Sequence, residues 1–243
     1  MTGAAGPQQG CPTVVRSLLM GQGISEVLPF AIGIAISPIP IIAIILILFS
    51  NRATANGLAF LFGWVAGLAV VGTAVYLFAD AANAATDSTS SDTISWGKIL
   101  LGVLLLSLAR RNFAKRPTPG QPEELPKWMA TVETITPVKA VGLAIVLAVV
   151  NPKNLILAVG ACAGLGQLGL STGDAVVGII VFVAVSSLSI LFAVGYELVG
   201  GERAHQTLDH MKEWMTQHNH AVMAVLFLVF GVVLIAKGIG LLS

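Results

Sequence analysis

Two short polar segments interrupt long apolar stretches of the chain, and each is centred on proline. They are Ser37-Pro38-Ile39-Pro40 and Asn151-Pro152-Lys153-Asn154. Proline removes a helical hydrogen bond and clashes with the preceding turn, so each segment predicts a broken helix. In hydrocarbon, such a break survives only where protein or a polar cavity supplies partners for the freed backbone groups. Paired breaks in two halves of a membrane protein are typical of a binding site at the centre of the bilayer.

Lys153 is the ionisable residue placed deepest in a predicted membrane span. A charge at that depth is costly, so it should face the bundle interior or a wet cavity. The alternative is that its side chain reaches the membrane interface, as basic side chains near helix ends do. The apolar and small residues that follow the break favour the interior position. A fixed cation beside a helix break favours an anionic substrate group such as carboxylate, phosphate or sulfate.

The uncharged residues of the two breaks have two interpretations. Asn151, Asn154 and Ser37 carry hydrogen-bonding groups that can cap the broken helix ends. The same groups can contact a substrate, and the two roles can coexist. The prolines would fix the geometry of the site. The predicted substrate-binding set is Ser37, Pro38, Pro40, Asn151, Pro152, Lys153 and Asn154.

The composition indicates a membrane protein. Hydrophobic residues make up 56% and charged residues 10% of the 243 residues, and the mean hydropathy is +0.88. Soluble domains average about 25% charged residues, so this chain cannot cover a water-facing surface. The net charge of +1 gives no support for nucleic-acid binding. The function must therefore be sought among polar residues inside the membrane.

Six stretches are apolar enough to predict transmembrane helices, and the third is marginal. They cover residues 24–48, 57–79, 94–109, 138–163, 174–198 and 221–242. The expected fold is an all-α polytopic membrane protein in which helices 1 and 4 are broken. Pro38 and Pro152 lie at the same depth in the first span of each half. This arrangement predicts two inverted three-helix repeats.

The chain divides into four predicted regions. A tail covers residues 1–23, the first repeat 24–109, a Pro-rich basic linker 110–137 and the second repeat 138–243. Within the second repeat, residues 201–219 have apolar side chains at helical spacing, namely Ala204, Leu208, Met211 and Met215. This pattern predicts an amphipathic helix on the inner membrane surface.

Basic residues are concentrated on one side of the membrane if the six spans alternate in direction. That side carries Arg52, Arg110, Arg111, Lys115, Arg116, Lys127, Lys139, Arg203 and Lys212. The opposite side carries Arg16, Lys98 and Lys237 together with several aspartates. The positive-inside rule then places the linker in the cytoplasm and both termini outside a multi-pass protein of the inner (cytoplasmic) membrane.

The remaining titratable residues give weaker signals. Glu26 and Glu197 lie near span ends, where interfacial charges are a simpler reading than proton coupling. Cys11 and Cys162 are isolated and form neither a disulfide framework nor a zinc site. Four histidines near the inner surface lack metal-ligand spacing: His205, His210, His218 and His220. With no nucleophile motif in the sequence, we expect no catalytic residue, metal or cofactor.

Both breaks resemble signatures of the lysine-exporter (LysE) transporter superfamily. Ile36-Ser37-Pro38-Ile39-Pro40 is similar to its Thr/Ser-Pro-x-Pro signature in the first span, and Val150-Asn151-Pro152-Lys153 to its Asn-Pro-Lys signature in the fourth. Over residues 24–242 the chain more closely resembles the actinobacterial GAP family, the glycopeptidolipid- and sulfolipid-addressing proteins. The resemblance implies a six-span inner-membrane protein that helps to move cell-envelope glycolipids, or their small building blocks, outward.

Two departures narrow what the resemblance implies. Ile39 replaces the glycine that is common between the prolines of amino-acid exporters, which favours a more amphipathic substrate. A thiol-reducing branch of the superfamily has a cysteine at each break, where this chain has Ile39 and Lys153. Redox shuttling is therefore disfavoured.

Three hypotheses remain open. The first is an exporter of an envelope glycolipid or its anionic small-molecule precursor, with Lys153 engaging the anionic group. The second is a membrane-embedded group transferase acting on envelope glycans, with Ser37, Lys153 or a loop histidine as its nucleophile or base. The third is a non-transporting subunit of a larger lipid exporter. The expected partners are membrane lipids and the substrate, and Gly63 and Gly67 form a small-residue face for packing within the chain or in a homodimer.

Overall fold

The computed structural model describes residues 12–85, 91–115, 132 and 134–241, and these form helices and no strand. The all-α expectation is confirmed for this part of the chain. In order, the helices are α1 (Pro12–Ala35), α2 (Pro38–Leu48), α3 (Ala53–Ala85), α4 (Ser91–Ala114), α5 (Pro137–Ile145), the π-helical η2 (Val146–Val150), α6 (Pro152–Gly166), α7 (Thr172–Ser186) and α8 (Leu188–Gly238). Half of the predicted tail (1–11, with Cys11) and most of the predicted linker (116–131 and 133) lie outside the described residues.

Both predicted breaks are sharp bends between consecutive helices. Ile36 and Ser37 separate α1 from α2, and these helices are bent by 53°. Asn151 separates η2 from α6, and the bend there is 62°. In each case the second helix begins with proline, whose fixed φ suits the first helical position and whose missing N–H breaks no hydrogen bond of the helix that it begins.

Among the described residues, two helices are long and apolar enough to cross a membrane, or up to four crossings exist if each bent pair counts as one. The two are Ala53–Ala82 within α3 and Leu188–Gly238, which is α8. The predicted third span lies in α4, where Lys98 and Arg110 bound a short apolar stretch. The predicted fifth span is divided at Ser187 between α7 and α8. Six spans therefore remain a prediction.

Helix α8 contains the segment predicted to be an amphipathic helix. Gly201 kinks it with φ 52° and ψ −139°, a backbone conformation that favours glycine. Beyond the kink, Ala204 and Leu208 are fully buried, and Met211 and Met215 pack partly against the core. The apolar face of residues 201–219 thus covers protein, and a position on the membrane surface stays a prediction.

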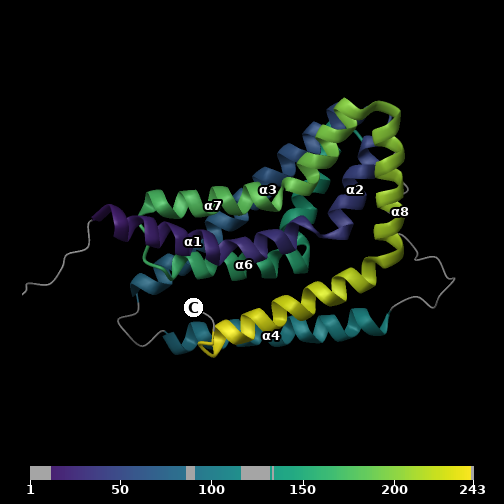
Figure 1. Ribbon diagram of the computed structural model, residues 1–243. Helices are drawn as coiled ribbons and strands as arrows, with labels where there is room; N and C mark the ends of the chain where they lie inside the picture. The colour runs from purple at the N-terminus through teal and green to yellow at the C-terminus, as the bar shows by residue number, and fades with distance from the viewer. Residues whose placement is uncertain (1–11, 86–90, 116–131, 133, 242–243) are drawn as a thin grey trace, which may run out of the picture.

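The helices form two groups (Figure 1). One contains α1, α3, α5, α6 and α7, and the other contains α4 and the C-terminal part of α8. Helix α1 packs against α6 and α7, while α3 packs against α5 and α6. The C-terminal part of α8 runs alongside α4 in the opposite direction. Gly102 and Gly231 allow this close approach, because a Cβ on Gly102 would lie 2.8 Å from the Gly231 carbonyl oxygen.

Large apolar side chains cover much of the outer surface. On α3, Phe62, Val70 and Phe78 are 69%, 68% and 82% exposed. Many exposed apolar side chains of this size are typical of a surface in contact with a membrane or another protein. Together with the long apolar helices, they identify the chain as a membrane-embedded protein.

Candidate functional site

The second break satisfies its own backbone with two asparagine side chains. Pro152 has no N–H, so a carbonyl in the preceding helix loses its donor. The Asn154 side chain replaces it, because Nδ2 donates to the Leu147 carbonyl at 3.0 Å. Asn151 is the N-cap of α6, and its Oδ1 accepts the Lys153 backbone N–H at 3.1 Å. The capping roles predicted for Asn151 and Asn154 are confirmed.

The first break is completed from the other half of the chain. Pro38 cannot donate to the Ile34 carbonyl, and the Ser37 N–H takes that carbonyl in a tighter turn at 3.1 Å. The Gly33 carbonyl, one residue earlier, therefore loses its helical donor. Lys153 Nζ donates to the Gly33 carbonyl at 2.7 Å. This hydrogen bond joins two breaks that are separated by 120 residues in the sequence.

Lys153 is enclosed by protein where α1, α6 and α8 meet. The residue is only 1% exposed, so its side chain does not reach the membrane interface. Gly33 is packed so closely that a Cβ there would collide with the Phe230 ring and lie 3.1 Å from Leu157. A Cβ on Gly160 of α6 would similarly lie 2.8 Å from the Phe30 ring. The charged side chain is therefore occluded inside the bundle.

Ser37 is not the cap that the sequence predicted. It occupies the N-cap position of α2, but its side chain makes no capping hydrogen bond. An N-cap oxygen accepts from the N–H of the second or third helical residue. The third residue here is Pro40, which has no N–H, so only the N–H of Ile39 at the second position is left for a cap. The buried Ser37 hydroxyl has no hydrogen-bond partner in the described structure.

The junction of the breaks therefore combines one cation with two unsatisfied polar atoms. An ammonium has three donors, and the described contacts of Lys153 Nζ use one of them on Gly33. Ser37 Oγ and Asn154 Oδ1 are both buried without partners in the described structure. Of the three prolines, Pro38 and Pro40 are buried and Pro152 is exposed. An ammonium and a buried hydroxyl are both donors, and donors of this kind suit an anionic group.

Residues 27–240, which include both breaks, match the family model described as Sap, sulfolipid-1-addressing protein. The chain belongs to this family. The match confirms the expected relationship to sulfolipid-addressing proteins. No curated protein and no solved structure matches the chain.

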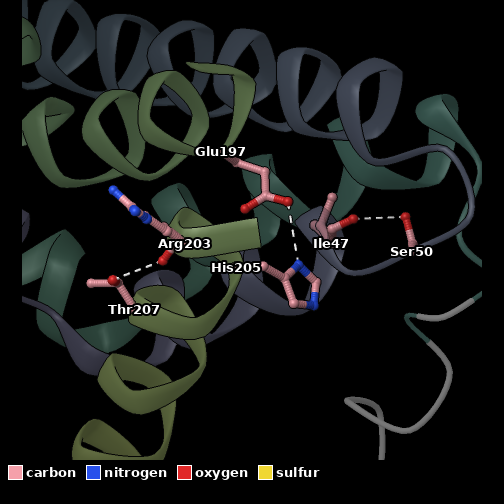
Figure 2. Close-up of polar contacts among 6 residues, drawn as sticks. All are labelled: Ile47, Ser50, Glu197, Arg203, His205 and Thr207. Carbon is pink, nitrogen blue, oxygen red and sulfur yellow. Dashed lines mark hydrogen bonds and ion pairs between the residues drawn. The ribbon is translucent and has the colours of Figure 1, made fainter. Parts of the chain in front are cut away.

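In this sulfolipid-addressing family member, Glu197 belongs to a second titratable cluster (Figure 2). His205 Nδ1 lies 3.3 Å from Glu197 Oε1, and the Gly201 kink separates the two residues along α8. Two nearby hydroxyls make local backbone hydrogen bonds: Ser50 donates to Ile47 at 2.7 Å and Thr207 to Arg203 at 2.9 Å. Glu197 is thus paired with a histidine at the bend of α8. Among the described residues, no group of three histidines, cysteines or acidic residues could hold a metal ion.

Sequence reasoning missed the polar contacts of Glu26 and of Asn56 in this family member. Glu26 forms an ion pair with Lys237, although 211 residues separate them in the sequence. Asn56 is fully buried, and its Nδ2 donates to Ser50 Oγ at 3.0 Å and to the Ile135 carbonyl at 2.9 Å. Opposite charges on one predicted side of the membrane were the available signal for the ion pair. Nothing in the sequence distinguished Asn56 from an ordinary interfacial residue.

The small-residue face of α3 packs within the chain. A Cβ on Gly63 would lie 2.6 Å from the Val141 carbonyl oxygen of α5. A Cβ on Gly67 would lie 3.1 Å from Ala148 of η2. These glycines therefore bring α3 close to the helix that precedes the second break, and they help to position that break.

Proposed function

We propose that this protein exports a cell-envelope glycolipid or its anionic precursor across the inner membrane, or assists that export. The observation that carries the proposal is the buried Lys153 side chain, which lies at the junction of two broken helices. An intramembrane cation is costly, and it is retained mainly where a substrate or ion uses it. Membership of the sulfolipid-1-addressing protein family supports a link to lipid export.

The proposed architecture is six spans in two inverted three-helix repeats, related to the lysine-exporter superfamily. Contacts between helix ends support it. Asn56, after the first predicted span, meets Ile135, before the fourth. Asn112, after the third, lies 3.2 Å from His220 Nδ1, before the sixth. Alternating spans would bring these ends to one side of the membrane. The charge bias makes that side cytoplasmic and both termini extracytoplasmic. A reporter that works only outside the cytoplasm should therefore be active when it is fused to the C-terminus.

The occluded lysine defines how a substrate would bind. In the proposed cycle, one group of helices moves relative to the other and opens the junction of the breaks. An anionic oxygen then replaces the Gly33 carbonyl as the partner of Lys153 Nζ, which now donates at 2.7 Å. The unpartnered Ser37 hydroxyl supplies a second donor from the other break. The two halves would thus hold the same anionic group between them.

The test is complementation of a strain that lacks the protein. Wild type, Lys153→Met and Lys115→Met would be expressed at equal levels in the membrane, and surface-extractable lipids compared with total lipids by mass spectrometry. Lys115 is exposed just beyond α4, so it provides a matched control for removing one lysine. We expect Lys153→Met to leave the lipid synthesised but absent from the surface extract, and Lys115→Met to export normally.

The same lipid profiles separate the exporter from its alternatives. Lipids that lack a substituent in the deletion strain would identify a group transferase. Normal surface lipids with Lys153→Met would refute the exporter and favour an accessory subunit of a larger lipid exporter. A homodimer would need a surface other than the Gly63 and Gly67 face, which α5 and η2 cover within the chain.

A further inference from the structure

A polar cavity lies away from the helix breaks, among residues from four different helices. Its volume is about 270 Å³. Glu26 comes from α1, Lys98 from α4, Gly164 from α6 and Lys237 from α8. Water occupies about 30 Å³ per molecule in the liquid, so the cavity has room for a sulfate, phosphate or carboxylate group with bound water.

The ionic side chains of this cavity carry an excess positive charge. Glu26 and Lys237 form an ion pair, and the side chain of each is 12% exposed. Lys98 lines the same cavity as these two residues, so the three charged side chains share one polar environment. No carboxylate other than Glu26 lines the cavity in the described part of the chain. One carboxylate cannot neutralise two lysines, and the remaining charge favours an anion.

Neutral donors surround the same cavity. Gln22 from α1 and Gln167 at the end of α6 contribute side-chain amides, each with two N–H donors. Gly164 leaves space for the carboxylate of Glu26, because a Cβ there would collide with it. The glycine lets the ion pair lie against α6 and leaves Lys98 facing the cavity from α4. Charged and neutral donors on several helices are typical of sites that bind oxyanions.

We propose that this cavity binds the anionic group of the exported molecule, with Lys98 as its principal cation. The proposal deepens the proposed function and rests on it for the identity of the ligand. The ligand class is an oxyanion, namely a sulfate, phosphate or carboxylate, borne by a lipid headgroup or free in solution. Because Lys237 is shared with Glu26, an arriving anion competes with that carboxylate for it. In the proposed orientation the cavity lies on the extracytoplasmic side and receives the anion after Lys153 releases it.

The test measures binding by the full chain in nanodiscs of phosphatidylcholine. Inorganic sulfate and phosphate are titrated by calorimetry at constant chloride concentration. We expect Lys98→Met to weaken oxyanion binding by about tenfold or more, as expected for the loss of one charge-assisted hydrogen bond. Glu26→Gln should tighten it because the competing carboxylate is gone. Lys115→Met, at the other end of α4, should bind as wild type does.

Lys98→Met removes a positive charge and Glu26→Gln removes a negative one, so the two variants should change oxyanion affinity in opposite directions. Both variants would be checked for a cooperative melting transition, which shows that they are folded, and Lys98→Met leaves the Glu26–Lys237 ion pair intact. Equal binding by wild type, Lys98→Met and Glu26→Gln would overturn the proposal, as would no binding of either oxyanion or of the sulfated lipid used next.

A second arm identifies the source of the anion. Nanodiscs containing a sulfated galactolipid are compared with nanodiscs containing the same lipid without sulfate. If only the sulfated lipid distinguishes wild type from Lys98→Met, the cavity recognises a headgroup. If inorganic sulfate or phosphate distinguishes wild type from Lys98→Met equally well, the cavity recognises a free oxyanion.

Failure of this proposal is separable from failure of the proposed export. Lys153→Met should keep oxyanion binding at the cavity while losing export. Normal export by Lys153→Met, together with Lys98-dependent binding, would refute the function of the breaks and leave the cavity as an oxyanion site. Loss of export by Lys153→Met with no Lys98-dependent binding would support the function of the breaks and refute the oxyanion site in the cavity.

Discussion

The two helix breaks have similar backbones, but their free backbone groups find hydrogen-bond partners in different places. The second break uses its own side chains, and the first uses a side chain from the other half of the chain. The second break carries Asn151 and Asn154, which bond to the ends of the helices on either side of it. The first break has Ser37 at the corresponding corner, and this side chain bonds to nothing in the described structure. The Gly33 carbonyl, which has lost its helical donor, accepts a hydrogen bond from Lys153 in the other half of the chain.

This difference shows that inverted architecture does not require equivalent chemistry in the two halves. The second break is self-sufficient in its backbone hydrogen bonds, and the first depends on it. Lys153 is therefore both the cation of the junction and the partner of a carbonyl that would otherwise be unsatisfied. A structural role and a binding role make opposite predictions for its removal, which can be measured.

The largest effect is expected for Lys153→Met. A buried charge without a carboxylate partner costs several kcal/mol, whereas the Gly33 carbonyl left unpaired costs about 1–3 kcal/mol. The first term wins, so the variant should be as stable as wild type or more stable by about 1–3 kcal/mol, while export is lost. Chemical unfolding in detergent measures the stability. A fall of several kcal/mol in the free energy of unfolding would instead show that the lysine has a structural role.

The next largest effects are expected for glycine substitutions before the two breaks, which should change stability in opposite directions in the two halves. Gly33→Ala places a methyl group against the Phe230 ring and should destabilise the protein by about 1–3 kcal/mol through overpacking. Gly142→Ala, in α5 before the second break, meets no atom within 4 Å. It should stabilise by about 0.5–1 kcal/mol, the usual gain for alanine in a helix interior. Equal effects in unfolding experiments would contradict the packing difference between α1 and α5.

Asn154→Leu tests the self-sufficiency of the second break. The substitution removes the donor to the Leu147 carbonyl while keeping the size of the side chain. It also removes the unsatisfied Oδ1, so the net loss of stability should be about 1 kcal/mol, at the lower end of the cost of an unpaired buried carbonyl. Lys153 keeps its charge, so residual export should track the amount of folded protein. Export lost from fully folded protein would place Asn154 in direct contact with the substrate.

The sequence was sufficient to predict the breaks, because proline at a helix interior has few structural outcomes. It also placed Lys153 inside the protein, since the apolar residues after it leave no short route to the interface. The partner of that lysine could not be predicted. Every helix before a proline frees a carbonyl, and only the packing of α1 on α6 brings the Gly33 carbonyl within reach of Nζ.

The spans were predicted less well because helix ends depend on packing as well as on hydropathy. The predicted fifth span ignores the break at Ser187, whose side chain donates to the Val183 carbonyl at 2.7 Å and whose backbone ends α7. Gly201 was not recognised as a kink, because glycine is common inside membrane helices. The Glu26–Lys237 pair was missed for a different reason, since pairing of distant charges depends on which helices are neighbours.

The smallest effect should come from Ser37 and Pro40, and it tests why the first break lacks a cap. In the wild-type background Ser37→Ala removes an oxygen without a partner, so stability should stay unchanged or rise slightly. Pro40→Ala restores an N–H at the third position of α2, where the Ser37 hydroxyl can accept it. Ser37→Ala should then cost about 1 kcal/mol in the Pro40→Ala background, a coupling that a double-mutant cycle measures. Without this coupling, Pro40 would not be what prevents capping. A loss of export by Ser37→Ala at undiminished stability would show that the hydroxyl is left unpaired by the protein for the substrate to use.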